Sequence, residues 1–193
     1  MATNIEIEAK ALITRDEYFK VVEHFKADKL KKITQTNFYI DTDEMELRKI
    51  RVGLRIRQSD DFILTLKAPL AEGLLEQNEN ITWKQYEDFK ETGTFPEGKV
   101  KEFLKMLRIN PDTLKILTQL TTERIYIPDV YEDGTFSIDK NTYNDIVDYE
   151  LELEGNSLNK CKEKLKSICN ECQIEFKDNI QSKHNRAFST MKK

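Results

Sequence analysis

The sequence predicts an α+β fold in which an antiparallel β-sheet closes on its charged face and helices pack outside it. The first observation is the strict alternation of apolar and charged side chains in residues 5–11, which residues 149–154 repeat. Successive side chains of a strand point to opposite faces, so each of these strands has one charged face. The second observation is that the charges on these faces are segregated by sign.

Acids and bases cluster on different strands, except that Lys10 shares a strand face with Glu6 and Glu8. The acids of residues 5–11 and 149–154 are Glu6, Glu8, Glu150, Glu152 and Glu154. The bases of a predicted hairpin, residues 53–57 and 62–67, are Arg55, Arg57 and Lys67. Like charges on one strand face repel, and burying ions only for stability gains little because desolvation offsets their attraction. A sheet closed on its charged face would bring the two sets together. The alternative is an open sheet with its charged face in water.

The strands are predicted in chain order from alternation, β-forming residues and turns. They cover residues 5–11, 35–42, 53–57, 62–67, 120–127, 135–139 and 149–154. Residues 74–79 are interpreted as a short irregular strand and residues 174–176 as a short last strand. Asp133 and Gly134 predict a hairpin turn, and residues 44–51 a surface connection.

The helices are predicted from N-terminal caps followed by apolar residues at helical spacing. Thr14 with Glu17 and Thr82 with Gln85 have the spacing of capping boxes, and Ser157 is a further cap. The residues expected to face the core are Tyr18, Val21, Val22, Phe25, Trp83, Tyr86, Phe89, Val100, Phe103, Leu104, Leu107, Leu158, Cys161, Leu165, Ile168 and Cys172.

Length and composition favour one domain over residues 1–193. The formal net charge of -4 argues against a nucleic-acid-binding protein. The sequence has neither an apolar run that could span a bilayer nor a signal-peptide pattern, so we expect a cytoplasmic protein without a membrane partner. The cysteines, Cys161, Cys169 and Cys172, are expected to be reduced and buried on a helix face.

The side-chain types on the charged faces suit a phosphate chain and its cation. Carboxylate oxygens are hard ligands for Mg²⁺ or Mn²⁺. Arginine guanidinium groups match phosphate oxygens bidentately, and lysine adds a point charge. Together these groups could bind a polyphosphate and activate a water for in-line attack.

These residues also carry a resemblance to a known family. Residues 6–10, Glu-Ile-Glu-Ala-Lys, resemble the ExExK signature of the CYTH superfamily, the triphosphate tunnel metalloenzymes. The resemblance continues in order through residues 54–57, 64–67 and 122–124, Asp139, residues 150–152 and Lys183. It covers nearly the whole chain, and it is strongest to the bacterial stand-alone, YjbK-like group.

The resemblance implies an eight-stranded antiparallel tunnel with a charged lumen and helices outside. It implies a divalent metal, Mg²⁺ or Mn²⁺, held by Glu6, Glu8, Glu150 and Glu152. It implies triphosphate binding by Lys10, Arg55, Arg57, Lys67, Arg124 and Lys183, with catalytic roles for Glu6, Glu8 and Lys10. Further acidic positions match less closely: Glu76, for which Glu79 is an alternative, Asp139 and Glu154. His184 and Arg186, beside Lys183, are interpreted as surface charge.

The function that follows is hydrolysis of a small triphosphate, which could be inorganic tripolyphosphate, thiamine triphosphate or a nucleoside triphosphate. A class IV-type adenylate cyclase would use the same residues, but no adenine pocket can be recognised in the sequence. A non-catalytic polyphosphate-binding module would need the bases but not the acids, and both sets are present. We expect a monomer or a homodimer.

Overall fold

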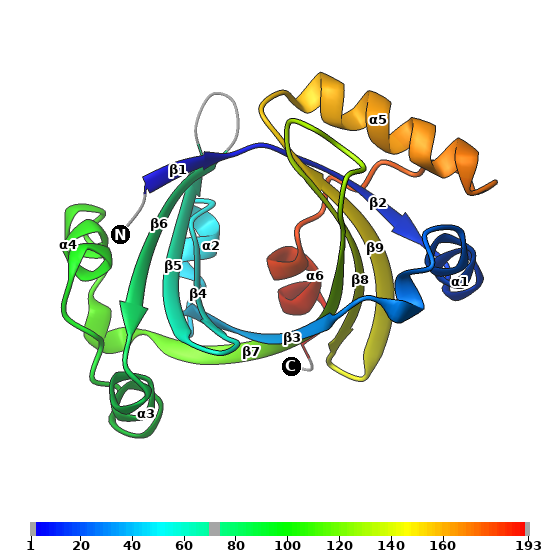
Figure 1. The fold of residues 1–193 in the computed structure, drawn as a ribbon. Coiled ribbons are helices and arrows are strands. Elements are labelled where there is room, and N and C mark those ends of the chain that lie inside the picture. Colours follow the sequence, from blue (N-terminus) through cyan, green and yellow to red (C-terminus); the bar gives the residue numbers. More distant parts are fainter. Residues whose placement is uncertain (1–2, 70–73, 192–193) are drawn as a thin grey trace. The chain divides into compact units, whose positions relative to one another are not determined.

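The computed structural model describes residues 3–69 and 74–191, and the side chains of residues 3–6 and of Leu74 lie outside the described part. The strands are β1 (Thr3–Glu6), β2 (Glu8–Ile13), β3 (Lys32–Asp41), β4 (Gly53–Gln58), β5 (Phe62–Pro69), β6 (Leu74–Ile81), β7 (Lys115–Ile127), β8 (Thr135–Tyr143) and β9 (Ile146–Glu154). The helices are α1 (Arg15–His24), η1 (Ala27–Lys29), α2 (Glu46–Lys49), α3 (Trp83–Thr92), α4 (Lys99–Met106), η2 (Pro111–Thr113), α5 (Leu158–Glu171) and α6 (Lys183–Ser189). Figure 1 labels these elements.

The chain divides into two compact units. The first unit comprises Met1–Ile5, Thr36–Leu120 and Ala187–Lys193, and the second comprises Glu6–Gln35 and Thr121–Arg186. The strand order is β1-β6-β5-β4-β3 in the first unit and β7-β8-β9-β2 in the second, with β3 next to β7 in the order. Both β3 and β7 contribute residues to both units.

The hairpin predicted for the first unit is confirmed. Strand β4 pairs antiparallel with β5, with Arg55 opposite Thr65, and β5 pairs with β6, with Lys67 opposite Glu76. Leu54, Ile56, Leu64 and Leu66 point to the other face and are buried in an apolar cluster. The charged and apolar faces therefore separate as the alternation predicts.

Helices α3 and α4 cover the apolar face of the first unit (Figure 1). Tyr86 and Phe89 of α3 are buried in the cluster with Val100 and Leu104 of α4. The Thr82–Gln85 capping box is confirmed. Trp83, expected to face the core, is 60% exposed, so that part of the prediction is wrong.

Residues 74–81 form a regular strand, β6, rather than the short irregular strand that the sequence predicts. The predicted surface connection contains the short helix α2. Asp41 of β3 caps this helix, because its carboxylate accepts hydrogen bonds from the backbone N–H groups of Leu47 and Arg48 at 2.9 and 3.0 Å. The cap satisfies donors that would otherwise be left unpaired at the helix start.

The second unit is built around β8, β9 and β2, which pair antiparallel. Glu150 of β9 lies opposite Asp139 of β8, and Glu152 lies opposite Lys10 of β2. The intervening residues, Ile138, Leu151 and Leu153 among them, are buried in a second apolar cluster. The charged residues of these three strands therefore share the opposite face.

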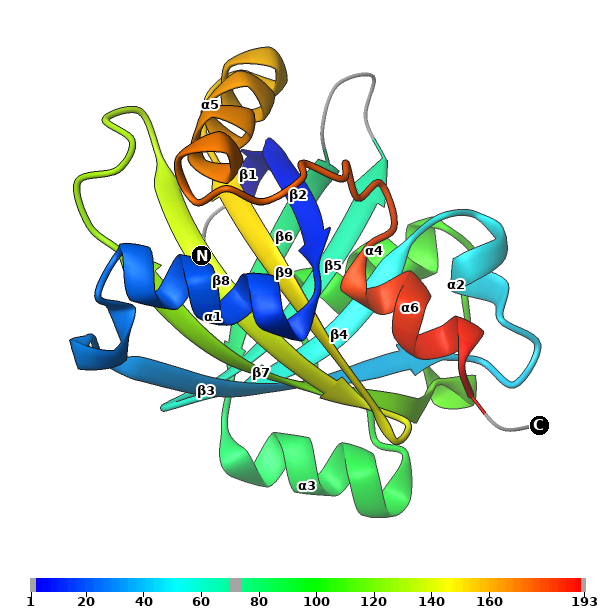
Figure 2. The same ribbon diagram turned by 90° about the vertical axis from the view of Figure 1, so that its right-hand side faces the viewer.

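Helices α1 and α5 cover the apolar face of these strands (Figure 2). The Thr14–Glu17 capping box of α1 is confirmed. Cys161, Leu165 and Ile168 of α5 and Cys172, directly after this helix, face the cluster as predicted, and Cys169 joins them. Leu158, also predicted to face the cluster, is 46% exposed, and the Ser157 side chain makes no capping hydrogen bond.

Two further expectations are corrected. The predicted first strand is interrupted at Ile7, so it counts as β1 and β2, and the order within residues 3–69 and 74–191 contains nine strands. Ile174 and Phe176 do not form a strand, although Asp178 makes an isolated bridge to Ala11. Strands β1 and β2 stand at the two ends of the order of described strands, and closure into a barrel stays a prediction. Within residues 3–69 and 74–191, no helix is long and apolar enough to cross a membrane.

Candidate functional site

Three carboxylates converge on the charged face of the second unit. Asp139 comes from β8, and Glu150 and Glu152 come from β9. One oxygen of each lies within 4.8 Å of one oxygen of the others. We call these three residues the acidic cluster. Asp139 and Glu150 are fully buried.

Lys183, at the start of α6, lies among these carboxylates. Its Nζ is 2.9 Å from Asp139 Oδ2 and 2.8 Å from Glu150 Oε2, and it also donates to Glu152. Arg124 of β7 binds Asp139 bidentately, at 2.7 Å through Nε and 2.5 Å through Nη2, and also donates to Glu152. Two of the bases that the resemblance implies, Lys183 and Arg124, therefore contact these carboxylates, whereas the hairpin bases belong to the first unit.

The pKa values in the cluster show that its charged forms are stabilised. Burial opposes the ionisation of Glu152, yet Lys183, Arg124 and Lys10 hold its pKa well below the ordinary value. Burial also opposes the ionisation of Glu150, but Lys183 and Arg186 lower its pKa against the repulsion of Glu152. Burial alone would lower the pKa of Lys183, whereas the three carboxylates raise it well above its ordinary value. Glu150, Glu152 and Lys183 are therefore charged near neutral pH.

Strand β2 adds two of the predicted residues to this face. The Nζ of Lys10 donates to Glu8 Oε1 at 2.5 Å. Burial disfavours the charged amine of Lys10, but Glu8, Glu152 and Glu150 raise its pKa. Glu154 lies opposite Glu8 at the end of β9 and is exposed, unlike Glu150 and Glu152. The side chain of Glu6 lies outside the described residues.

Arg186 is a site residue that the sequence interpretation missed. It is 5% exposed, so its assignment as surface charge is wrong. Its Nη2 donates to Glu150 Oε2 at 2.9 Å, and its Nε donates to Asp148 Oδ2 at 2.9 Å. No local pattern indicates this burial, because the partners lie on β9, more than thirty residues earlier in the chain.

Further polar groups surround these ion pairs. The amide of Asn179 donates to Glu150 Oε1 at 2.7 Å. Tyr143 donates its hydroxyl to Asp148 Oδ2 at 2.6 Å, and burial together with this bond raises the pKa of Tyr143 to about 12. Asn141 also donates to Asp148. These neutral donors keep the buried acids hydrogen-bonded.

The first unit carries the other predicted bases on the charged face of β4, β5 and β6. Lys67 Nζ lies 3.4 Å from Glu76 Oε2. Burial raises the pKa of Glu76, but Lys67 and Arg55 outweigh it and lower the pKa overall. The Nε of Arg55 is buried and has no hydrogen-bond partner among the described residues. A buried guanidinium donor without a partner suits an anionic ligand.

Thr65 and Asn78 connect this face across β5 and β6. The Thr65 hydroxyl donates to Asn78 Oδ1 at 2.7 Å, and the Asn78 amide donates to Glu76 Oε1 at 3.0 Å. Arg57 shares the face by its position in β4, two residues after Arg55. Glu76 is therefore held in place beside the bases of the first unit.

Glu79, the alternative to Glu76, has a different role. Its two carboxylate oxygens accept hydrogen bonds from the backbone N–H groups of Lys99 at 2.5 Å and Val100 at 3.0 Å. A Cβ on Gly98 would lie only 2.5 Å from that carboxylate, so the close approach requires glycine there. Glu79 caps α4, and Glu76 is the acid that lies with the bases.

The acidic cluster has the chemistry of a divalent-cation site. Its donors are carboxylate oxygens from three side chains, which suit Mg²⁺ or Mn²⁺ better than a thiolate-binding metal. The same oxygens contact Lys183 and Arg124, so a bound cation would compete with these two bases. Lys183 and Arg124, once displaced by the cation, could bind the oxygens of a phosphate chain.

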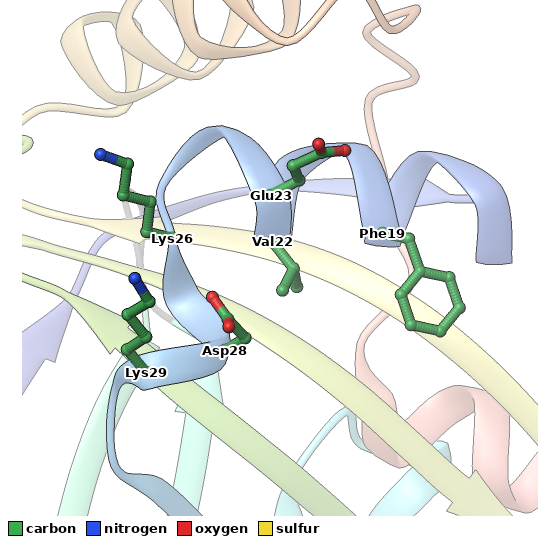
Figure 3. Close-up of a pocket in the computed structure, with 6 residues that line it drawn as sticks. All are labelled: Phe19, Val22, Glu23, Lys26, Asp28 and Lys29. Carbon is green, nitrogen blue, oxygen red and sulfur yellow. The ribbon is translucent and has the colours of Figure 1, made fainter.

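A surface pocket lies elsewhere in the second unit, beside α1 and η1 (Figure 3). It is lined by Phe19, Val22, Glu23, Lys26, Asp28 and Lys29. None of these residues is a predicted site residue. We assign the site to the charged strand face instead, because the buried ions converge there.

Comparison with known proteins agrees with these features. The sequence matches the CYTH domain family over residues 4–182. It is 33% identical over 158 residues to YjbK of Bacillus subtilis (strain 168), named as a candidate triphosphatase, with 80% of each chain covered. It resembles a Bacillus halodurans structure, named as a candidate adenylate cyclase, with a TM-score of 0.88, 32% identity and 97% and 100% of the two chains covered. It also shares the fold of HpAC1 from Hippeastrum, with a TM-score of 0.78, 20% identity and 96% of each chain covered.

Proposed function

The chain belongs to the CYTH domain family, and on that premise we propose that it is a divalent-metal-dependent triphosphatase. The substrate would be inorganic tripolyphosphate, thiamine triphosphate or a nucleoside triphosphate. Two relatives point the same way: YjbK is named as a candidate triphosphatase, and a dominant triphosphatase activity is stated for HpAC1.

The observation that carries the proposal is the buried acidic cluster with its basic partners. Three carboxylates, the ammonium of Lys183 and the guanidinium groups of Arg124 and Arg186 share a small part of the second unit. Buried ion pairs commonly contribute little net stability, because desolvation offsets their attraction. An array of this size is better explained by a ligand that needs both charges, such as a phosphate chain with its cation.

The roles of the residues follow from their chemistry. Asp139 and Glu152, with Glu8 and Glu6 from the predicted set, would hold Mg²⁺ or Mn²⁺, which neutralises phosphate charge and activates water when bound. Lys10, Arg124 and Lys183 would bind phosphate oxygens. The attacking water forms an O–P bond as the bridging P–O bond breaks, which gives diphosphate and phosphate.

Arg55, Arg57 and Lys67 of the first unit would bind the same phosphate chain. The unpartnered Nε of Arg55 supports an anionic ligand on that face. The proposal includes closure of the sheet around the ligand, because β1 and β2, at the two ends of the strand order, are separated in sequence by Ile7 alone. Weaker triphosphate binding in both Arg55→Ala and Arg124→Ala would support binding of one ligand by both sets of bases.

Adenylate cyclisation is the competing reaction, since the Bacillus halodurans relative is named as a candidate cyclase. The same groups would bind ATP, but the ribose 3′-hydroxyl would attack the α-phosphorus and release diphosphate. A non-catalytic polyphosphate-binding protein is the third reading. The intact acidic cluster favours catalysis over binding alone.

A product panel separates these functions. The pure protein is incubated with Mg²⁺ or Mn²⁺ and with tripolyphosphate, thiamine triphosphate or ATP, and the products are resolved. Metal-dependent release of phosphate supports the triphosphatase, and cyclic AMP with diphosphate supports the cyclase. Tight binding without turnover of any substrate contradicts both enzymes.

A matched pair of substitutions tests the site. Glu152→Gln removes one charge from the cluster and should abolish metal-dependent turnover. Glu154→Gln removes the same charge two residues later on the same strand, at an exposed position, and should retain most of the activity. Equal loss in the two variants would contradict the assignment of the cluster.

A further inference from the structure

The side chain of Glu150 differs from its neighbours in the number of donors around it. Its Oε1 accepts from Asn179 Nδ2 at 2.7 Å and from Arg186 Nη1 at 3.2 Å. Its Oε2 is 2.9 Å from Arg186 Nη2 and 2.8 Å from Lys183 Nζ. A carboxylate offers about four lone-pair sites, and these contacts occupy them.

Glu152 is less fully engaged. Among the described residues, Lys183 contacts its Oε1 and Arg124 contacts its Oε2. A cation that approaches the cluster therefore finds more acceptor capacity on Glu152 than on Glu150. This difference separates two glutamates that the sequence pattern treats as equivalent.

Arg186 is also close to Lys183 along α6. The two residues are three apart in α6, so they lie on neighbouring positions of one helix face. Arg186 is bound to Asp148 at 2.9 Å, to Glu150, and through Nη1 to the backbone oxygen of Gln181 at 2.9 Å. These bonds tie the start of α6 to β9.

From these contacts we infer that Arg186 is a positioning residue: it withdraws Glu150 from cation binding and holds Lys183 over Asp139 and Glu152. The inference rests on the proposed function for its effect on turnover, but its effect on cation binding can be measured without substrate.

The test compares Mn²⁺ binding with turnover. Free Mn²⁺ is measured by its EPR signal while the metal is titrated into the protein without triphosphate. Arg186→Met should bind Mn²⁺ about threefold more tightly or better, because Glu150 regains acceptor capacity and a nearby positive charge is lost. Its turnover of Mg²⁺–tripolyphosphate should fall about tenfold or more, because Lys183 loses its anchor. If Arg186 had only a structural role, its substitution would lower Mn²⁺ affinity and turnover together.

The double variant Arg186→Met/Asp148→Asn separates charge from geometry. It restores the local net charge, so its Mn²⁺ binding should stay tighter than that of the wild type only if Glu150 has become a ligand. In Arg186→Ala, added guanidinium should restore part of the turnover. Arg15→Met, an exposed substitution on α1, should leave both measurements unchanged.

Three results would overturn the inference. They are unchanged Mn²⁺ affinity in Arg186→Met, a parallel fall of affinity and turnover, and a return of the double variant to wild-type affinity. If Arg186→Met does not fold, Arg186→Lys provides the same comparison with a smaller expected change. If the wild type turns over no triphosphate, the proposed function fails, and the Mn²⁺ titrations still test the role of Arg186.

Discussion

Lys183 Nζ lies 2.9 Å from Oδ2 of Asp139, a carboxylate that is fully buried. Lys183 thus compensates the acidic cluster together with Arg124 and Arg186. Lys183→Met should lower the free energy of unfolding by about 3–5 kcal/mol, the usual cost of leaving buried charges unpaired. Urea unfolding followed by circular dichroism measures this loss.

Millimolar Mg²⁺ should recover part of that stability in Lys183→Met, because a divalent cation can replace the ammonium among the carboxylates. Lys20→Met, at an exposed position of α1, is the control and should be neutral with and without Mg²⁺. Equal stability of Lys183→Met in Mg²⁺ and in EDTA would contradict a cation site at this cluster.

The pH dependence of stability follows from the depressed pKa of Glu152. Its pKa in the folded protein lies well below the ordinary value of 4.5. The resulting stabilisation is present above pH 4.5 and is lost as the pH falls through the folded pKa. The difference in unfolding free energy between wild type and Glu152→Gln should be constant from about pH 6 to 8 and shrink below about pH 4.5. A difference that grows on acidification would refute the assigned shift.

Lys183 gives the opposite dependence at high pH. Its folded pKa lies above 10.5, so its contribution is present below pH 10.5 and is lost as the pH rises through the folded value. The unfolding free energy measured from pH 8 to 11 should therefore show no decrease due to Lys183 below pH 10.5. A decrease in unfolding free energy below pH 10.5 that occurs in the wild type but not in Lys183→Met would contradict the raised pKa.

The cap of α4 provides a test in the first unit. Glu79→Ala leaves the N–H groups of Lys99 and Val100 without their acceptor. We expect a loss of about 1–2 kcal/mol, typical of a removed helix cap. Glu91→Ala, at an exposed position of α3, is the control and should change stability little. Full stability of Glu79→Ala in urea unfolding would show that the cap is dispensable.

The cysteines should be unreactive in the folded protein. Burial raises the pKa of Cys169 and of Cys172 to about 11 and also raises that of Cys161. Because the thiolate is the reactive form, iodoacetamide at pH 8 should label all three only after unfolding. Rapid labelling of the native protein, detected by mass spectrometry, would contradict their burial.

Strict alternation in the sequence is sufficient to predict both faces of the main strands. In β9, Leu151 and Leu153 are buried in the apolar cluster, while Glu150 and Glu152 join the charged face. A period of two leaves no other arrangement in a strand with one buried face. The alternation alone therefore assigns the acids of β8 and β9 to the charged faces of their strands.

Helical spacing is less decisive at the first residue of a helix. Trp83, Tyr86 and Phe89 are spaced by three, and each step of three falls about 60° short of a full turn. Tyr86 and Phe89 are buried, which leaves Trp83 at the edge of the apolar stripe and 60% exposed. The sequence shows the spacing of the three aromatic residues but not which two of them face the apolar core.

Arg186 could not be predicted because nothing near it in sequence requires its burial. Its partners, Asp148 and Glu150, belong to β9. Arg186 reaches them because the segment after α5 runs back beside β2, where the Asn179 N–H donates to the Lys10 carbonyl at 2.8 Å. A charged residue in a basic tail is exposed in most proteins. Long-range pairing overrides that preference here.

The central claim is that the acidic cluster binds a cation together with a phosphate chain. Its most direct test is the anomalous difference map of crystals grown with Mn²⁺ and imidotriphosphate, a non-hydrolysable analogue. We predict an Mn²⁺ peak in contact with Glu152 and Asp139, with Lys183 and Arg124 turned onto phosphate oxygens. A map in which Mn²⁺ binds elsewhere while the ion pairs of the cluster stay intact would contradict the claim.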